Sequence, residues 1–225
     1  MSASQPHAPN LRRSESVLPA WVKEGGRAAL APVVRLAIAL RLTPNTITVI
    51  GLVITIVASV VIGAGWLLLG AAILTTGSLL DAVDGALARA TGGSTAFGSF
   101  LDSTLDRAGE AILYLGIGAW LLTSQPEPMW PVLVVMLALA ASFLVSYAHA
   151  RAQGIGLAAD VGLLPRTERL VIVIVGVALA GLGLAPALIA ALVVIAALGA
   201  ITVIQRIWHV WRLGSGDAEL PKKEN

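Results

Sequence analysis

Four aspartates in a mostly apolar part of the sequence are the residues best suited to chemistry. Asp81 and Asp84 are three positions apart, and Asp102 and Asp106 are four apart. On a helix, both separations place the two side chains on one face. Residues 91–94 read Thr-Gly-Gly-Ser, a turn signal that can reverse the chain and bring the two pairs together. A carboxylate near hydrocarbon is costly, so these acids indicate a functional site.

The convergence of four carboxylates predicts a metal site. Like charges in a low-dielectric environment repel each other unless a cation joins them. Hard divalent cations prefer oxygen ligands, and two of them would balance four carboxylates. We therefore expect two divalent cations, Mg²⁺ or Mn²⁺, as cofactors. The alternative is a buried acid cluster that pairs with Arg89 and Arg107 and holds no metal.

The aspartates belong to a longer pattern, D-x2-D-G-x2-A-R-x8-G-x3-D-x3-D, over residues 81–106. This pattern resembles the signature of the CDP-alcohol phosphotransferase family and matches it at every specified position. The resemblance extends over about residues 42–212, although its specificity resides almost wholly in residues 81–106. It implies a reaction in which a CDP-linked alcohol, commonly CDP-diacylglycerol, meets a second alcohol. CMP leaves and a phosphodiester forms.

The resemblance also implies a role for each fixed residue of the pattern. Asp81, Asp84 and Asp102 would be metal ligands. Asp106 would lie close to the metal and act as the general base that takes the proton of the acceptor hydroxyl. The CDP pocket would be lined by the four other fixed residues, Gly85, Ala88, Arg89 and Gly98. For Gly85 the alternative is close helix packing, and for Arg89 it is a marker of the cytoplasmic side.

A second polar cluster is a candidate site for a phosphate on the acceptor. Arg151 ends one expected helix, and Arg166 and Arg169 open the next. Arginine pairs bidentately with phosphate, so the three could form an acceptor pocket, with His149 as a weaker candidate. The alternative is topology marking and contact with lipid headgroups. For His149 an equally good interpretation is a polar residue at a helix end whose hydrogen bonds are satisfied within the protein.

The arrangement of this second cluster resembles the prokaryotic phosphatidylinositol phosphate synthase branch of the family. That resemblance implies inositol 1-phosphate as the acceptor. His149 and Gln153 depart from the residues that the branch often carries at these positions. The second choice of acceptor is glycerol 3-phosphate, followed by other phosphorylated or free alcohols.

The composition is that of an integral membrane protein. Of the 225 residues, 57% are hydrophobic and 12% are charged, far below the quarter that is usual for a soluble domain. A formal net charge of +2 gives no indication of nucleic-acid binding. The sequence has no cysteine, which excludes disulfides and thiolate chemistry.

The apolar runs predict an all-α fold with six membrane-spanning helices and an interfacial amphipathic helix before them. We expect a disordered segment at 1–17, the interfacial helix at 18–41, the six-helix catalytic domain at 42–213 and a flexible tail at 214–225. The spans are expected at about 45–62, 66–91, 98–123, 129–152, 167–182 and 185–211.

The basic residues predict the orientation of the chain in the plasma membrane. All 15 Lys and Arg lie in the N-terminal segment, near the second and fourth connections between spans, or near the C-terminus. Basic residues mark the cytoplasmic side. Both termini and the end of the bundle that carries the aspartates are therefore expected in the cytoplasm.

Other readings of the same residues are a cation transporter that uses the four aspartates, and a structural member of the family without activity. A transporter favours broken helices and an ion site near the midplane, whereas these acids lie toward one end beside basic residues. The resemblance also implies a homodimer. Ser142, Ser146 and Ala150 offer a seam of small residues for it, although such seams also pack within a monomer.

Overall fold

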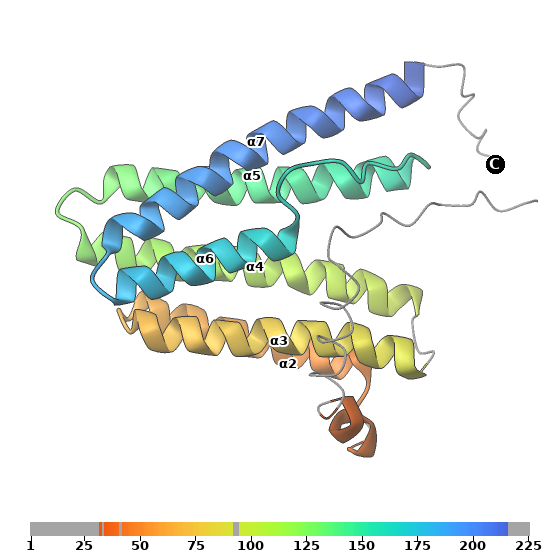
Figure 1. Cartoon of the computed structure of the whole chain (residues 1–225), viewed down its shortest axis with the longest axis horizontal. Helices are drawn as coiled ribbons and strands as arrows, with labels where there is room; N and C mark the ends of the chain where they lie inside the picture. Colours follow the sequence, from red (N-terminus) through yellow and green to blue (C-terminus); the bar gives the residue numbers. More distant parts are fainter. Residues whose placement is uncertain (1–31, 33, 41, 92–94, 216–225) are drawn as a thin grey trace, which may run out of the picture.

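The computed structural model describes residues 32, 34–40, 42–91 and 95–215, and for residues 82, 84, 85 and 88–91 it describes the backbone alone. This part of the chain is all-helical, as predicted (Figure 1). Each of the six expected helices is present, with ends that agree to within a few residues. They are α2 (Pro44–Gly63), α3 (Leu67–Thr91), α4 (Ala96–Ser124), α5 (Met129–Gly154), α6 (Arg166–Gly181) and α7 (Ala185–Ser215).

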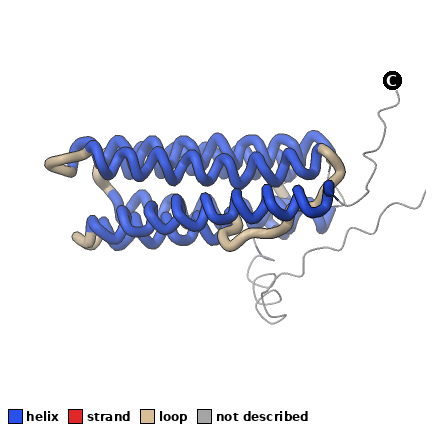
Figure 2. The backbone as a smooth tube through the Cα atoms, turned by 90° about the horizontal axis from the view of Figure 1, so that it is seen from above, coloured by secondary structure: helices blue, strands red, loops and turns tan. Residues whose placement is uncertain are grey.

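The helices form an elongated bundle of two groups. α2 packs on α3 and α4, while α5 packs on α7. α6 packs on α7 and also contacts α3, and α4 contacts α5. The α3–α6 and α4–α5 contacts therefore join the two groups. Figure 1 shows α4 and α6 between the α2–α3 pair and the α5–α7 pair, and Figure 2 shows the helices running side by side along the bundle. α3 and α6 therefore meet in the interior, and the ion pair between Arg169 and Glu110 joins α6 to α4.

Local signals in the sequence explain where α2 and α4 begin. Thr43 is the N-cap of α2 and accepts a hydrogen bond from the backbone N–H of Thr46, and Pro44 follows in the first turn, where its missing N–H costs nothing. Thr95 caps α4 in the same way, with its hydroxyl accepting from the N–H of Gly98 at 3.0 Å. This cap fixes the start of the helix that carries two of the acids.

A close contact between α2 and α4 holds these helices together. A Cβ on Gly116 would overlap the backbone of Ser59, and the Ser59 hydroxyl donates a hydrogen bond to the Ile112 carbonyl. Small residues permit such close approach of helices in membrane proteins. The contact orients the remainder of α4, including its acids, relative to α2.

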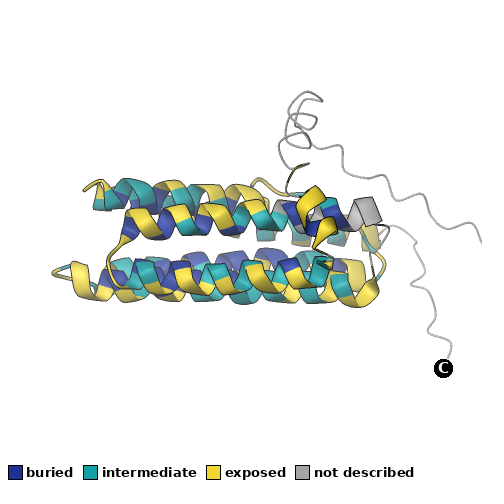
Figure 3. Cartoon of the chain, turned by 90° about the horizontal axis from the view of Figure 1, so that it is seen from below, coloured by how far each residue is buried: buried dark blue, intermediate teal, exposed yellow. Residues whose placement is uncertain are grey.

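Three of the helices, α2, α5 and α7, are long and apolar enough to cross a membrane by length and composition. In α3 the apolar part is Leu67–Asp81, α4 carries the acids, and α6 has 16 residues. Large hydrophobic side chains are exposed on the outer faces of the bundle, while the buried residues lie between the helices (Figure 3). This distribution agrees with an integral membrane protein.

The expected N-terminal helix is described only in part. Residues 34–39 are helical, and Ala37 packs with Ile47 of α2 and with Val83 and Leu87 of α3. The expected disordered segment 1–17 lies outside the described residues. The same holds for the expected tail, except that Gly214 and Ser215 belong to α7.

The seam of small residues on α5 is used within one chain. Ser142 is fully buried, with its hydroxyl 3.4 Å from that of Tyr114 on α4, and Ser146 is buried too. Two members of the seam are therefore not available to a second copy. The expected homodimer stays a prediction that needs another surface.

Candidate active site

Three of the four predicted aspartates meet in space. Asp81 on α3 and Asp102 and Asp106 on α4 each place one carboxylate oxygen within 4.8 Å of the others. All three are partly buried. Asp84 follows Asp81 by one turn of α3, and its side chain lies outside the part of the chain that the structure describes.

Arg166 lies directly against this acid cluster. It is the first residue of α6, and its Nη1 is 3.1 Å from Oδ2 of Asp81 and 2.7 Å from Oδ2 of Asp106. Arg107 is the second cation, with Nη1 at 3.7 Å from the same oxygen of Asp106. The alternative without metal paired the acids with Arg107, but Arg166 makes shorter contacts with them. A residue predicted for the acceptor phosphate thus adjoins the predicted general base.

Arg169 lies deeper, one turn further along α6, with 2% of its side chain exposed. Its Nε donates to Oε1 of Glu110 at 3.2 Å, and its Nη2 donates to Oε2 of Glu110 at 3.5 Å. Its Nη1 donates to the Leu164 carbonyl at 3.3 Å, just before α6 begins. The predicted phosphate ligand is therefore a buried member of an ion pair between α4 and α6.

A cavity of about 60 Å³ joins these groups between α2, α3, α4 and α6. Its charged lining consists of Asp81, Asp106, Glu110, Arg166 and Arg169. Hydroxyl groups and apolar side chains from the four helices complete it. Two acids of the cluster, Asp81 and Asp106, and the two arginines of α6 thus face one space.

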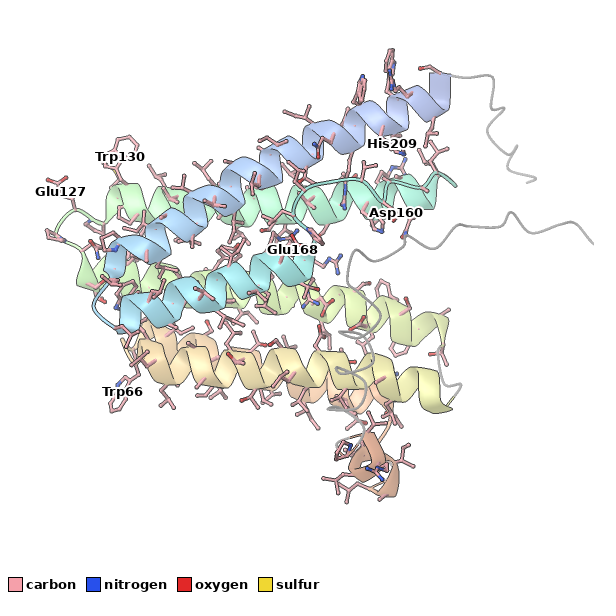
Figure 4. All side chains as sticks on the ribbon, viewed as in Figure 1. Trp66, Glu127, Trp130, Asp160, Glu168 and His209 are labelled. Atoms are coloured by element: carbon pink, nitrogen blue, oxygen red, sulfur yellow. The ribbon has the colours of Figure 1, made fainter. Side chains whose placement is uncertain are left out.

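The two other residues predicted for the acceptor lie apart from this cavity. Arg151 is exposed in the last turn of α5. Nε2 of His149 is 3.0 Å from the side-chain nitrogen of Gln153, and its Nδ1 is 3.2 Å from the Ala159 carbonyl and 3.7 Å from Asp160. His149 thus has the partners of a satisfied polar residue at a helix end. Figure 4 shows Asp160 near the end of α5 and Glu168 at the start of α6.

Comparison with known proteins decides the family. Residues 41–212 match the sequence model of the CDP-alcohol phosphatidyltransferases. The chain belongs to this family. It is therefore a transferase of phospholipid biosynthesis, which decides against the cation transporter.

Several relatives share most of the chain with this phosphatidyltransferase. The archaetidylinositol phosphate synthase of Methanothermobacter thermautotrophicus is 41% identical over 172 residues, which are 76% of this chain and 84% of the relative. The phosphatidylinositol phosphate synthase of Corynebacterium glutamicum is 36% identical over 186 residues, which are 82% of this chain and 85% of the relative.

Crystal structures of the phosphatidylinositol phosphate synthase of Mycobacterium tuberculosis share its fold. The structure with CDP-DAG bound superposes with a TM-score of 0.77 at 31% identity, over 84% of this chain and 98% of that one. A second structure of the same enzyme, in complex with manganese and citrate, also has a TM-score of 0.77 at 31% identity, and covers 84% and 93% of the two chains.

The donor set of this phosphatidyltransferase fits a hard divalent cation. Asp81, Asp102 and Asp106 supply only carboxylate oxygens, the ligands that Mg²⁺ and Mn²⁺ prefer. Such ions bind oxygen at about 2.0–2.6 Å, so one ion can lie between oxygens that are within 4.8 Å of one another. The arrangement could bind metal. The side chain of Asp84, the fourth predicted ligand, lies outside the described part of the chain.

The residues predicted for the CDP pocket are described unevenly. Gly85, Ala88 and Arg89 belong to α3, but nothing beyond their backbone is described. At Gly98, in the first turn of α4, a Cβ would lie 2.9 Å from Oδ1 of Asn45, at the end of a side chain near the start of α2. This contact fits Gly98 to the start of α2, and its role toward the nucleotide stays a prediction.

Glu110 is the functional candidate that the sequence analysis missed. It follows Asp106 by four residues, and Asp102 precedes Asp106 by four, so the three acids share one face of α4. That spacing was the available signal. Glu110 was not among the predicted site residues because it lies outside the family pattern, which ends at Asp106.

Proposed function

We propose that this enzyme transfers the phosphatidyl group of CDP-diacylglycerol, or of a related CDP-lipid, to a hydroxyl of inositol 1-phosphate, with release of CMP. The observation that carries this proposal is the contact between Arg166 and Asp106, 2.7 Å apart at the cavity that Arg169 also lines. A phosphate held by the arginines would place the acceptor beside Asp106. The names of the relatives support an inositol phosphate acceptor.

In this proposal Asp106 accepts the proton of the attacking hydroxyl. The acceptor oxygen forms a bond to the phosphorus next to the lipid, and the bond from that phosphorus to the bridging oxygen of the diphosphate breaks. CMP leaves with the electron pair of that bond. Asp81, Asp84, Asp102 and Asp106 would hold two divalent cations, Mg²⁺ or Mn²⁺. When bound, the cations supply charge neutralisation for the diphosphate and the leaving oxygen.

The remaining predicted residues serve binding in this proposal. Gly85, Ala88, Arg89 and Gly98 would hold the CDP group. Arg166 and Arg169, which line the cavity, would hold the acceptor phosphate, whereas the predicted Arg151 and His149 lie apart from the cavity. Residues 42–213 would form the catalytic domain with all six helices spanning the plasma membrane, within a homodimer surrounded by membrane lipids. Both termini and the aspartates would face the cytoplasm.

The proposed topology can be tested by labelling, since the native chain has no cysteine. Glu127 lies in the connection between α4 and α5 (Figure 4), after the end of α4, whereas Asp102 and Asp106 lie in the first half of α4. Glu127→Cys is expected to react with an impermeant thiol reagent outside intact cells, and Ser215→Cys only after lysis. The reverse pattern would invert the proposed orientation.

The acceptor phosphate can be tested with arginine variants. A charge-assisted contact to phosphate contributes about 1.5–3 kcal/mol, which is about a tenfold to hundredfold change in affinity. Arg166→Gln and Arg169→Gln are each expected to raise the KM for inositol 1-phosphate by about that factor, and Arg151→Gln, at a residue apart from the cavity, by less. The phosphate itself does not react, so KM is the parameter that should change. For Arg166→Gln kcat is expected to fall as well, because its Nη1 contacts Asp106.

Arg212→Gln is the matched control, because Arg212 stacks on Trp208 in the last turns of α7, away from the cavity. Its acceptor KM should equal that of the wild type. An unchanged acceptor KM in all three test variants would reduce the arginines to topology markers. Wild-type turnover of glycerol 3-phosphate above that of inositol 1-phosphate would replace the proposed acceptor.

A further inference from the structure

The ion pair between Glu110 and Arg169 is placed where it can act on the acceptor. Asp106, Glu110 and Tyr114 follow each other at intervals of four on α4, and all three line the cavity. Arg169 reaches the same cavity from α6. The pair thus forms the part of the cavity wall that lies one helical turn beyond the predicted general base.

The hydrogen bonds of Arg169 leave part of its guanidinium available. Arginine has five N–H donors. The bonds to the two carboxylate oxygens of Glu110 and to the Leu164 carbonyl use one donor each on Nε, Nη2 and Nη1. Within the described part of the chain, one N–H on each terminal nitrogen has no hydrogen-bond partner. These two donors match two oxygens of a phosphate, because arginine binds such groups bidentately.

Glu110 also determines where the charge of Arg169 is held. Asp81 and Asp106 line the same cavity and are the nearest alternative anions in it. Without Glu110, a guanidinium that is 2% exposed would have to find another partner, because an unpaired charge in the interior is costly. Pairing with the aspartates would occupy carboxylates that the reaction needs. The carboxylate of Glu110 prevents this by holding Arg169 one helical turn beyond Asp106 along α4.

A purely structural role would not call for charges here. Apolar side chains pack α4 and α6 into the rest of the bundle core, and replacing a buried ion pair by apolar residues is often neutral for stability. We propose that Glu110 is a positioning residue: it orients Arg169 so that its two free donors bind the phosphate of the acceptor. This inference rests on the proposed phosphorylated acceptor.

The test is a double-mutant cycle with Glu110→Gln, Arg169→Gln and the double variant, in the purified full-length enzyme. Glu110→Gln is expected to raise the KM for inositol 1-phosphate by about tenfold, while the KM for CDP-diacylglycerol stays at the wild-type value. In the double variant the acceptor KM should equal that of Arg169→Gln alone, because residues that act as a unit are not additive.

Glu168→Gln is the matched control. Glu168 is the exposed neighbour of Arg169 in sequence (Figure 4), and its loss of charge should leave both KM values unchanged. Glu110→Asp keeps the charge but shortens the side chain by one methylene, so its acceptor KM should lie between those of the wild type and Glu110→Gln. If Glu110→Gln does not yield folded enzyme, Glu110→Asp decides by the same comparison.

An acceptor KM that stays at the wild-type value in the Glu110 variants, or losses that add in the double variant, would overturn the positioning role. Equal effects on both substrates would do the same, since they indicate a general loss of packing. Assays of the wild-type enzyme distinguish a failure of the positioning role from a failure of the proposed function. If it uses unphosphorylated inositol as well as inositol 1-phosphate, the proposed acceptor itself is wrong.

Discussion

Asp81→Ala and Asp102→Ala are each expected to lower kcat by at least about a thousandfold while the protein still inserts and purifies. A bound cation lowers the barrier of phosphoryl chemistry by several kcal/mol, and each 1.4 kcal/mol corresponds to about a tenfold change in rate. Removing one carboxylate from the cluster on α3 and α4 removes an oxygen, proposed as a metal ligand, that lies within 4.8 Å of its neighbours. CMP release measures the rate, and paramagnetic resonance of Mn²⁺ measures metal binding separately.

The control for these two variants is Glu127→Ala, which removes an exposed carboxylate at the other end of the bundle. Its activity and its Mn²⁺ binding should match those of the wild type. Asp81→Ala or Asp102→Ala enzyme that keeps more than about a tenth of the wild-type kcat would contradict a metal role for that residue. Unchanged Mn²⁺ affinity in both variants would place the ion elsewhere.

Asp106→Asn is expected to lower kcat by a factor of about 10² to 10⁴, the range that general bases contribute. Asparagine keeps the shape of the side chain but cannot accept the proton of the acceptor hydroxyl. Single-turnover kinetics with CDP-diacylglycerol and inositol 1-phosphate would locate the loss in the chemical step.

The two proposed roles of Asp106 predict different secondary effects. As the base alone, Asp106→Asn should leave Mn²⁺ binding and the KM for CDP-diacylglycerol unchanged. As a metal ligand too, it should weaken both. A kcat within about threefold of the wild type would refute the assignment of Asp106 as the base, because even the smallest contribution of a base exceeds that factor.

The fold could be predicted from the sequence because the apolar runs and their interruptions carry most of the information. Gly63, Pro128 and Gly183 lie at or beside helix ends, and the helices between them form as expected. The number of membrane spans is harder to predict. By length and composition α2, α5 and α7 could each cross a membrane, whereas α3, α4 and α6 do not meet the same criteria. Several of their charged residues, among them Asp106, Glu110 and Arg169, line the cavity between the helices, which composition alone does not reveal.

The acid cluster was predictable because each pair of aspartates has helical spacing and a turn signal lies between the pairs. The position of Arg166 was not, since it depends on how residues 155–165 lead from α5 into α6. That connection is fixed by two contacts with α7. The Thr202 hydroxyl accepts from the backbone N–H of Leu163 at 3.2 Å, and Nε of Arg206 donates to the Val161 carbonyl at 2.9 Å.

Glu110 and His149 show the limits of reading residues one at a time. A glutamate and an arginine separated by 59 positions carry no mutual signal in one sequence. His149 was a candidate for the acceptor site because it is a polar residue near Arg151, but its side chain contacts Gln153, the Ala159 carbonyl and Asp160 instead. Both outcomes depend on tertiary contacts.

The most direct measurement of the central claim is CMP release by the purified enzyme with CDP-diacylglycerol, Mn²⁺ or Mg²⁺, and inositol 1-phosphate. We expect release that requires both the metal and the acceptor, stops in excess EDTA and returns when the metal is restored, with phosphatidylinositol phosphate as the lipid product. Full activity in excess EDTA, or no CMP release with any phosphorylated alcohol, would contradict metal-dependent transfer at the Asp81–Asp102–Asp106 cluster.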